Sequence, residues 1–158
     1  MKTIKIVGIS GVGKTTLIEM FIAENPACST MNYGDYLVRY GDSADKRWAS
    51  NLMLAQGLVL IADHLEFGDR DFAALYRAEE TRGILLLTVT PEELLKRRKQ
   101  DLTKKRSQEM SGVTAEQMKA EKRARGIAQE LCIPLRSLRD ATLLDSYRAL
   151  RELVRNVG

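Results

Sequence analysis

The sequence predicts a three-layer α/β domain in which a five-stranded parallel sheet carries helices on both faces. Two observations lead to this fold class. Aliphatic runs alternate along the chain with segments of helical periodicity, which indicates strand–helix–strand units with right-handed crossovers. The run at 58–61 is apolar at every position and the run at 84–89 at all but one, as is typical of strands buried on both faces. With 158 residues and no internal repeats, the chain is expected to form one domain, 1–158.

The first strand, at 4–8, leads directly into a glycine-rich motif. Residues 8–15 read GISGVGKT, which fits the phosphate-loop pattern G-x-x-x-x-G-K-[ST] at every fixed position. The glycines let successive N–H groups converge on phosphate oxygens, Lys14 adds a mobile cation, and Thr15 can place its hydroxyl on Mg²⁺. The motif therefore predicts ATP or another nucleoside triphosphate as a ligand. The residues predicted to hold it are Gly8, Ser10, Gly11, Val12, Gly13, Lys14, Thr15 and Thr16.

The following elements bring polar residues to the carboxyl edge of the sheet, where ligands of open α/β sheets bind. A helix with an apolar stripe at Leu17, Ile18 and Phe21 ends at residues 25–26, and a short strand follows at 28–32. That strand ends in a polar turn. We expect the turn to contact the second substrate through Tyr33, Gly34 and Asp35.

A second set of polar residues follows the strand at 58–61. After a helix at 44–55 that ends at Gly57, this strand delivers Asp63 and His64 to the same edge. His64 is expected to contact the substrate. A carboxylate in this place suits a Walker B role, so Asp63 and Thr15 are the predicted contacts of a hydrated Mg²⁺ ion.

The second half of the chain continues the alternation. Helical character at 71–80 ends at Gly83, and the strand at 84–89 precedes a helix that begins at residues 90–91. Residues 107–112 break this helix, and a capping box at Thr114 and Gln117 opens a return helix. The predicted apolar stripe of the return helix comprises Ala120, Ala124, Ile127, Ala128 and Leu131. A last strand at 131–135 and an amphipathic helix at 140–157 complete the fold.

Positive charge is concentrated in one segment. Residues 96–125 hold eleven Lys and Arg against four acids, a net charge of +7, whereas the whole chain carries +4. Such a local field attracts polyanions such as triphosphates or nucleic acids. The two cysteines lack metal spacing, no apolar run is long enough for a membrane span, and no signal peptide fits, so a cytoplasmic protein is expected.

The chain resembles the archaeal-type adenylate kinases, of the nucleoside monophosphate kinase family. The likeness rests on the loop at 8–16, the turn at 31–35, the helix start at 90–91 and the pattern R-x-x-x-D-x-T-x-x-R at 97–106. It implies a P-loop NTPase fold with a basic lid at 97–125, an acceptor-binding arm at 36–57, and transfer of the γ-phosphoryl of MgATP to AMP. It implies a homotrimer as well. The catalytic residues that the resemblance implies are Lys14, Arg97, Arg106 and Arg125.

Two alternatives stay open. Only 27 residues separate Asp35 from Asp63, which is short for an arm that closes over a monophosphate. A kinase of a small metabolite or nucleoside, with Asp35 or Asp63 as the base, therefore competes with the adenylate kinase hypothesis. The basic segment also suits an RNA- or ribosome-associated ATPase. A GTPase is disfavoured because no Asn-Lys-x-Asp segment is present.

Overall fold

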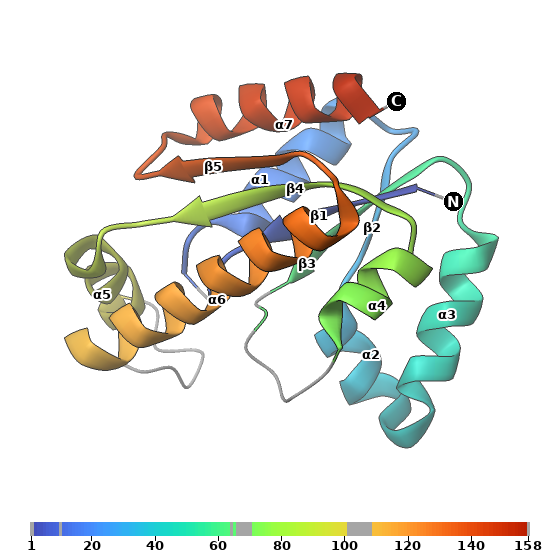
Figure 1. Ribbon diagram of the computed structural model, residues 1–158, viewed down its shortest axis with the longest axis horizontal. Coiled ribbons are helices and arrows are strands. Elements are labelled where there is room, and N and C mark those ends of the chain that lie inside the picture. Colours follow the sequence, from blue (N-terminus) through green and yellow to red (C-terminus); the bar gives the residue numbers. More distant parts are fainter. Residues whose placement is uncertain (1, 10, 64, 66–70, 101–108, 158) are drawn as a thin grey trace.

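The computed structural model describes residues 2–9, 11–63, 65, 71–100 and 109–157. Its five strands form one parallel sheet in the order β2-β3-β1-β4-β5, which confirms the predicted fold class (Figure 1). The strands are β1 (Lys2–Val7), β2 (Ser29–Met31), β3 (Leu58–Asp63), β4 (Thr81–Thr88) and β5 (Leu135–Arg139). The helices are α1 (Lys14–Glu24), α2 (Tyr33–Tyr40), the 3-10 turn η1 (Gly41–Ser43), α3 (Ala44–Leu54), α4 (Phe72–Ala78), α5 (Pro91–Gln100), α6 (Met110–Leu131) and α7 (Leu143–Val157).

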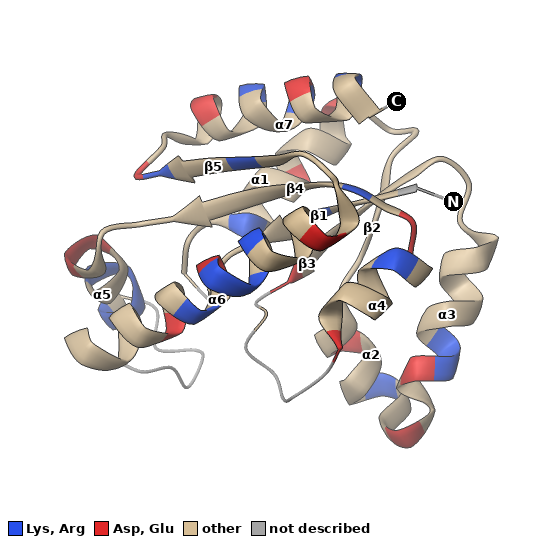
Figure 2. Cartoon of the chain, viewed as in Figure 1, with Lys and Arg blue, Asp and Glu red and all other residues tan. Residues whose placement is uncertain are grey.

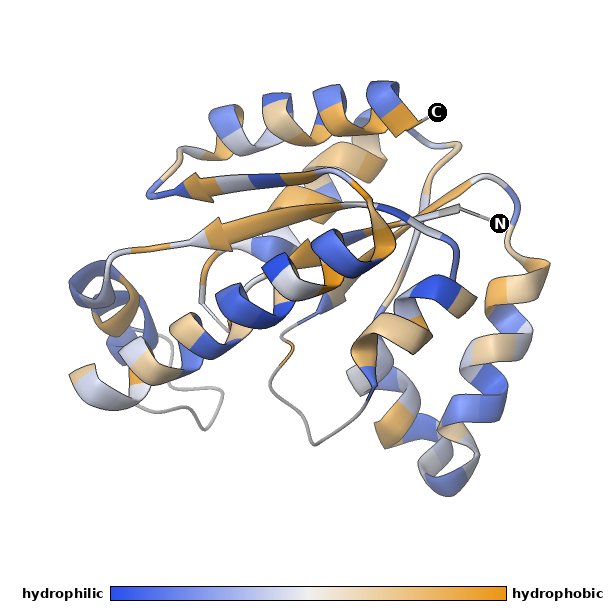
Figure 3. Cartoon of the chain, viewed as in Figure 1, coloured by the Kyte–Doolittle hydropathy of each residue, from blue (hydrophilic) through white to orange (hydrophobic). Residues whose placement is uncertain are grey.

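The sheet is covered on both faces. Helices α1 and α7 pack against each other on one side, and α4 and α6 pack on the other (Figure 1). The central strands are hydrophobic along much of their length (Figure 3), and residues 84–87 of β4 are at most 5% exposed. Because the register pairs Val7 with both Asp63 and Leu86, the carboxyl ends of β1, β3 and β4 meet at one edge.

Strand β4 begins three residues earlier than its sequence pattern predicts. The prediction that Gly83 ends the preceding helix is wrong, since α4 ends at Ala78 and Gly83 lies inside β4. A Cβ atom at position 83 would come within 3.0 Å of the Leu153 side chain on α7. Glycine at this position therefore permits close packing of helix on strand. The chain reversal before β4 falls at Glu80, which has a positive φ of 51°.

The predicted capping box at Thr114 and Gln117 is also wrong, because α6 has already begun at Met110. The Thr114 hydroxyl donates to the Met110 carbonyl at 2.8 Å, within the helix. The Gln117 side chain is buried and bonds the backbone of Val89 twice, accepting from its N–H at 3.0 Å and donating to its carbonyl at 2.7 Å. Gln117 therefore joins α6 to the chain just after β4.

The last strand lies four residues beyond its predicted start. Helix α6 continues to Leu131, and Cys132 ends it in the left-handed conformation with a φ of 53°. Strand β5 begins only after Pro134, which has no N–H to donate to a sheet ladder, although its carbonyl accepts from Ile84 N at 3.0 Å. The predicted apolar stripe of α6 faces the core, with Ala120, Ala124, Ile127 and Ala128 buried.

The segment between β2 and β3 folds as a pair of helices, α2 and α3, joined by η1. The predicted polar turn is in fact the first turn of α2, because the Asn32 side chain accepts from Asp35 N at 3.4 Å and caps the helix. Trp48 and Leu52 of α3 are buried and belong to a second hydrophobic cluster with Val59 of β3. This pair of helices forms the arm that the sequence places at 36–57.

Lys and Arg residues of the +7 segment lie on α5 and α6 (Figure 2). Not all of the predicted lid is a flap, since Val113, Ala120 and Ala124 of α6 belong to the main hydrophobic core. Residues 101–108, which contain Arg106, lie outside the described residues. Within the described chain, no helix combines the length and apolar character that crossing a membrane requires.

Candidate functional site

The phosphate loop connects β1 to α1 at the carboxyl edge of the sheet. Gly11 and Gly13 have φ values of 105° and 99°, in the region that glycine alone adopts without strain. Gly8 is needed for a different reason. A Cβ atom there would lie 2.5 Å from Val12 Cγ2 and 2.7 Å from the Leu87 carbonyl oxygen, so only glycine lets the loop pack against β4.

Replacing Gly8 with alanine should destabilise the protein by about 1–3 kcal/mol, the usual cost of overpacking, and weaken ATP binding. The reason is that the added methyl group meets a backbone carbonyl, which cannot move without distorting β4. Urea denaturation and ATP titration measure the two effects. Gly126→Ala on the exposed side of α6 is the matched control, and it should stabilise the protein slightly because nothing lies near the added atom. Equal stability of the two variants would contradict the packing argument.

Helix α1 begins at Lys14, directly behind the loop. The Lys14 side chain is buried, and its ammonium group contacts the Gly8 carbonyl and donates to the Ile9 carbonyl at 3.1 Å. Thr15 and Thr16 are exposed in the first turn of α1, where backbone N–H groups are unpaired and the helix dipole is positive. Val12 is buried, and Ser10 lies outside the described residues. The residues of the motif that the structure describes therefore lie together at the turn between β1 and α1, and phosphate binding by them stays a prediction.

Arg97 of α5 reaches the phosphate loop. Its Nη1 atom donates to the Gly11 carbonyl at 3.3 Å, and its Nε atom donates to Glu93 at 3.2 Å, one helical turn away. The side chain is 38% exposed. Guanidinium groups bind phosphate oxygens in a bidentate fashion, and Arg97 lies next to the loop predicted to hold them, so its catalytic role stays a prediction.

Asp63 ends β3 beside the phosphate loop. Its carbonyl accepts from Gly8 N at 3.1 Å, and its carboxylate is held on both oxygens, by Leu65 N at 2.9 Å and by the Tyr76 hydroxyl at 2.6 Å. Burial and the neighbouring Asp63 carboxylate raise the pKa of Tyr76 well above 10, so this hydroxyl remains a donor. His64 lies outside the described residues.

Asp35 and its neighbours lie on α2, after β2. Asp35 and Gly34 are exposed in the first turn, and among the described residues none donates to the Asp35 carboxylate. Tyr33 points elsewhere: its hydroxyl contacts Asp45, and its ring meets Trp48 edge-on at 5.5 Å. Since β2 is parallel to β3, the Asp35 end of α2 lies at the same edge of the sheet as Asp63.

The two arginines near the middle of α6 point in different directions. Residues 123 and 125 are about 200° apart around an ideal helix. Arg123 donates to the Leu65 carbonyl at 2.6 Å, at the turn just after Asp63, whereas Arg125 contacts Glu121 at 3.3 Å and Ser137 of β5 at 3.5 Å. Arg123, which the sequence analysis did not single out, is thus the one that approaches the carboxyl-edge turns. The catalytic role of Arg125 stays a prediction.

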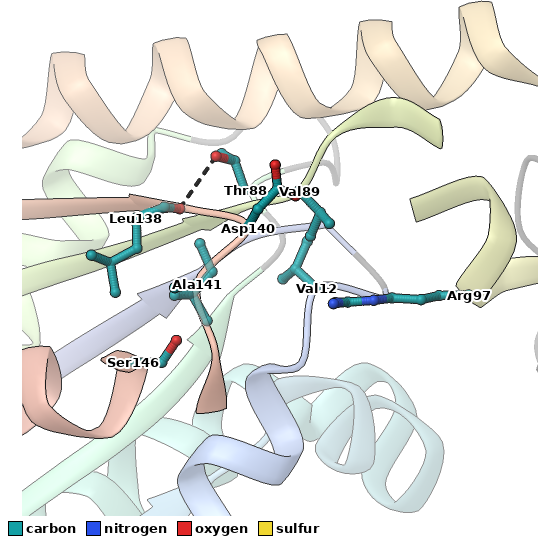
Figure 4. A pocket seen from close by; sticks show the side chains of 9 residues that line it. Val12, Thr88, Val89, Arg97, Leu138, Asp140, Ala141 and Ser146 are labelled. Atoms are coloured by element: carbon teal, nitrogen blue, oxygen red, sulfur yellow. Dashed lines mark hydrogen bonds between the residues drawn. The ribbon is translucent and has the colours of Figure 1, made fainter. Parts of the chain in front are cut away.

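A hollow lies beside the phosphate loop, between the ends of β4 and β5 and the start of α7 (Figure 4). Val12 and Arg97 border it on the loop side, and Asp140 and Ala141 border it on the side of β5. A more open region of about 410 Å³ continues past Thr90 and Thr142. The space adjoins the residues that would hold the phosphates, so the rest of a nucleotide can lie in it.

The side chains at the loop fit a hydrated Mg²⁺ ion. The exposed Thr15 hydroxyl and the partly exposed Asp63 carboxylate supply oxygen atoms, the ligands that Mg²⁺ prefers, and Mg²⁺ usually keeps several waters. Each oxygen of the Asp63 carboxylate accepts one hydrogen bond, from Leu65 N or from the Tyr76 hydroxyl. Each still has a lone pair for a second partner.

Solved structures with the same fold include kinases of small molecules. Shikimate kinase from Bacteroides thetaiotaomicron matches with a TM-score of 0.59 and 17% identity, over 97% of this chain and 98% of its own. A gluconokinase from Sinorhizobium meliloti 1021 gives a TM-score of 0.64 and 15% identity, over 99% and 93%. Shikimate kinase from Acinetobacter baumannii, in complex with shikimate, gives 0.62 and 13%, over 98% and 93%.

At these identities the similarity establishes the fold and not the substrate. The sequence matches no protein-family model and no curated protein. The fold that the chain shares with these kinases agrees with the fold class predicted from the sequence.

Proposed function

We propose that the chain is an ATP-dependent phosphotransferase that passes the γ-phosphoryl group of ATP to a small acceptor bound near the start of α2. One observation carries the proposal: at one edge of the sheet the phosphate loop bonds both the Arg97 guanidinium group, through Gly11, and the backbone of Asp63, through Gly8. A phosphate loop alone also suits switches and motors. An arginine on the loop and a carboxylate beside it are what phosphoryl transfer needs, because catalysis rests on positioning and on neutralising charge.

The acceptor that we favour is a small molecule with a hydroxyl group, and Asp35 is the base. The Asp35 carboxylate is exposed at the acceptor side of the sheet edge, whereas Asp63 already accepts two hydrogen bonds. In the reaction the acceptor oxygen bonds to the γ-phosphorus, the bond from that phosphorus to the bridging oxygen of ADP breaks, and the hydroxyl proton passes to Asp35. Fold neighbours that act on shikimate and gluconate support this class of acceptor.

The phosphate loop and its neighbours Arg97 and Asp63 have distinct roles in this scheme. The backbone N–H groups of Gly11 and Gly13 bind phosphate oxygens, Lys14 turns from the loop carbonyls to the outer phosphates, and Arg97 binds the transferring group. Thr15 and Asp63 would hold Mg²⁺, which when bound neutralises charge on the phosphates. The short arm formed by α2 and α3 covers the acceptor and excludes water.

A panel of acceptors tests the proposal. ADP release is measured with ATP and each of four groups of compounds: hydroxy acids such as shikimate and gluconate, sugars, nucleosides, and nucleoside monophosphates. Turnover of a hydroxy acid, sugar or nucleoside supports the assignment, and turnover of nucleoside monophosphates alone favours a phosphate acceptor. ATP hydrolysis that rises only with RNA and falls steeply with salt would favour the RNA-associated ATPase instead. Absence of ATP binding would overturn it altogether.

Replacing Asp35 with asparagine should lower kcat by about 100-fold with a hydroxyl acceptor, because general-base catalysis is lost. The KM for ATP should change little, since Asp35 lies on α2 and not on the phosphate loop. Steady-state kinetics at varied acceptor and ATP concentrations separate the two effects. Asp42→Asn, on the exposed turn η1 of the same arm, is the matched control. A similar loss in both variants would show that Asp35 is not the base.

A nucleoside monophosphate, AMP in the first place, is the second candidate acceptor. The pattern at 97–106 favours it, and the one residue of that pattern's arginine pair that can be placed, Arg97, does contact the loop. A phosphate acceptor is already anionic and needs no base. The Asp35→Asn variant therefore distinguishes the candidates, because it should retain activity toward AMP.

A further inference from the structure

A chain of buried polar side chains runs under the site, from the arm to Asp63. Lys5 lies in the middle of the central strand and is 1% exposed, and its ammonium group is 2.6 Å from Glu79 Oε1. Glu79 Oε2 accepts from the Trp48 indole N–H at 2.7 Å. The Lys5 ammonium also lies 4.5 Å from the centre of the Tyr76 ring, and the Tyr76 hydroxyl reaches Asp63.

Tyr76 is the member of this chain that contacts the site. It is 0% exposed and lies on α4, so its ring is fixed between the helix and β1. A cation over an aromatic ring is attracted to its face, and Glu79 fixes that cation in turn. The hydroxyl therefore has little freedom and ends 2.6 Å from Asp63 Oδ2.

We propose that Tyr76 is a positioning residue, which holds the Asp63 carboxylate in the orientation that binds Mg²⁺–ATP. The inference rests on the proposed function, in which Asp63 is the carboxylate on the metal side. Leu65 N fixes one oxygen from the loop that follows β3, and Tyr76 fixes the other from α4, so the plane of the carboxylate is set from two directions. Groups that orient a metal-binding carboxylate in this way contribute to metal affinity without touching the metal.

The same polar chain connects Asp63 to the acceptor side. Trp48 of α3 bonds Glu79, and its ring meets the edges of Tyr33 at 5.5 Å and Tyr36 at 5.2 Å. Both tyrosines lie on α2, whose first turn carries Asp35. The helix that carries Asp35 is therefore connected to Asp63 by one continuous set of side-chain contacts, although the Asp35 carboxylate itself is exposed.

The test is the Mg²⁺ dependence of ATP binding in Tyr76→Phe, measured by calorimetry without any acceptor. The substitution keeps the ring and its contact with Lys5 and removes only the hydroxyl. ATP binds more tightly as Mg²⁺ is added, and the midpoint of this increase is the Mg²⁺ concentration that the experiment measures. We expect this concentration to rise about 10-fold in Tyr76→Phe, while the affinity for ATP in EDTA stays unchanged. If Tyr76→Phe melts below the assay temperature, both proteins are titrated at a lower temperature at which the variant is folded.

Two further variants make each outcome decisive. Tyr147→Phe removes a matching bond, 2.6 Å from a tyrosine hydroxyl to Glu24, away from the phosphate loop, and should leave the Mg²⁺ dependence unchanged. Asp63→Asn should abolish most of the Mg²⁺ dependence of ATP binding. If Asp63→Asn has this effect and Tyr76→Phe does not, the positioning role is overturned and the proposed function stands. If neither variant changes the Mg²⁺ dependence, Asp63 itself is not on the metal side.

Discussion

Replacing Arg97 with alanine should lower kcat by about 1000-fold while the affinity for ATP falls much less. Arginines that neutralise the transferring phosphoryl group are worth about 10³ to 10⁵ in kcat, and the guanidinium group of Arg97 contacts the phosphate loop. Its present partners are the Gly11 carbonyl and the Glu93 carboxylate. Since these bonds are replaced by stronger ones as charge develops on the phosphoryl group, the effect belongs to the chemical step.

Rapid-quench kinetics with saturating ATP and acceptor measure that step directly. Arg136→Ala is a matched control, because Arg136 is also a half-exposed arginine in an ion pair, 3.0 Å from Glu152, and lies on β5. Arg125→Ala is the informative comparison. The resemblance to adenylate kinases predicts a loss as large as that of Arg97, whereas its contacts with Glu121 and Ser137 predict a small one. Turnover of Arg97→Ala at the level of Arg136→Ala would overturn the role of Arg97.

The phosphate loop could be predicted from sequence because its requirements act on adjacent residues. Gly11 and Gly13 are needed for their dihedral angles, and Lys14 follows them at a fixed distance along the backbone. The position of Asp63 beside the loop was predictable as well, since parallel strands end at the same edge and the register pairs Asp63 with Val7. The parallel sheet and its two-sided burial follow from apolar runs that alternate with helices, whereas this alternation does not fix the strand order β2-β3-β1-β4-β5.

The boundaries of helices and strands were less predictable. A residue type that usually caps a helix can instead be required for packing against a distant part of the chain. Thr114 and Gln117 have the spacing of a capping box, yet the Gln117 side chain forms hydrogen bonds with the Val89 backbone and the helix begins earlier, at Met110. Gly83 resembles a helix end and instead makes room for Leu153. In both cases the deciding partner is distant along the chain.

The residues that tie the site together were the least predictable. Lys5 and Glu79 are 74 positions apart, and no local pattern pairs them. The sequence could show that Lys5 needs a partner, because a lysine inside a central strand is buried and an unpaired buried charge is very costly. It could not show that the partner is Glu79. Likewise, helical periodicity predicts that Arg123 and Arg125 point to different sides of α6. Only the packing of α6 shows that Arg123 is the one that faces the turn after Asp63.

Replacing Lys5 with methionine should destabilise the protein by about 3–5 kcal/mol, the usual cost of leaving one partner of a buried ion pair alone. The methionine side chain is only one heavy atom shorter than that of lysine, so most of the loss is electrostatic rather than the cost of a cavity. Glu79, which is 4% exposed, would keep its bond from Trp48 but lose its counter-charge. Urea denaturation at neutral pH measures the change, and the slope should stay that of a cooperative transition.

The double variant Lys5→Met with Glu79→Gln separates the charge from the packing. It removes both charges while glutamine still accepts from the Trp48 indole, so it should recover about 2 kcal/mol or more of the loss. Arg136→Met, which breaks a pair that is more than half exposed on both sides, should cost less than about 1 kcal/mol. A single Lys5→Met variant as stable as Arg136→Met would mean that the buried pair contributes nothing. In that case the Lys5 cation would not be needed to hold the Tyr76 ring, and the Asp63 carboxylate would depend on the packing of α4 and on Leu65 N for its orientation.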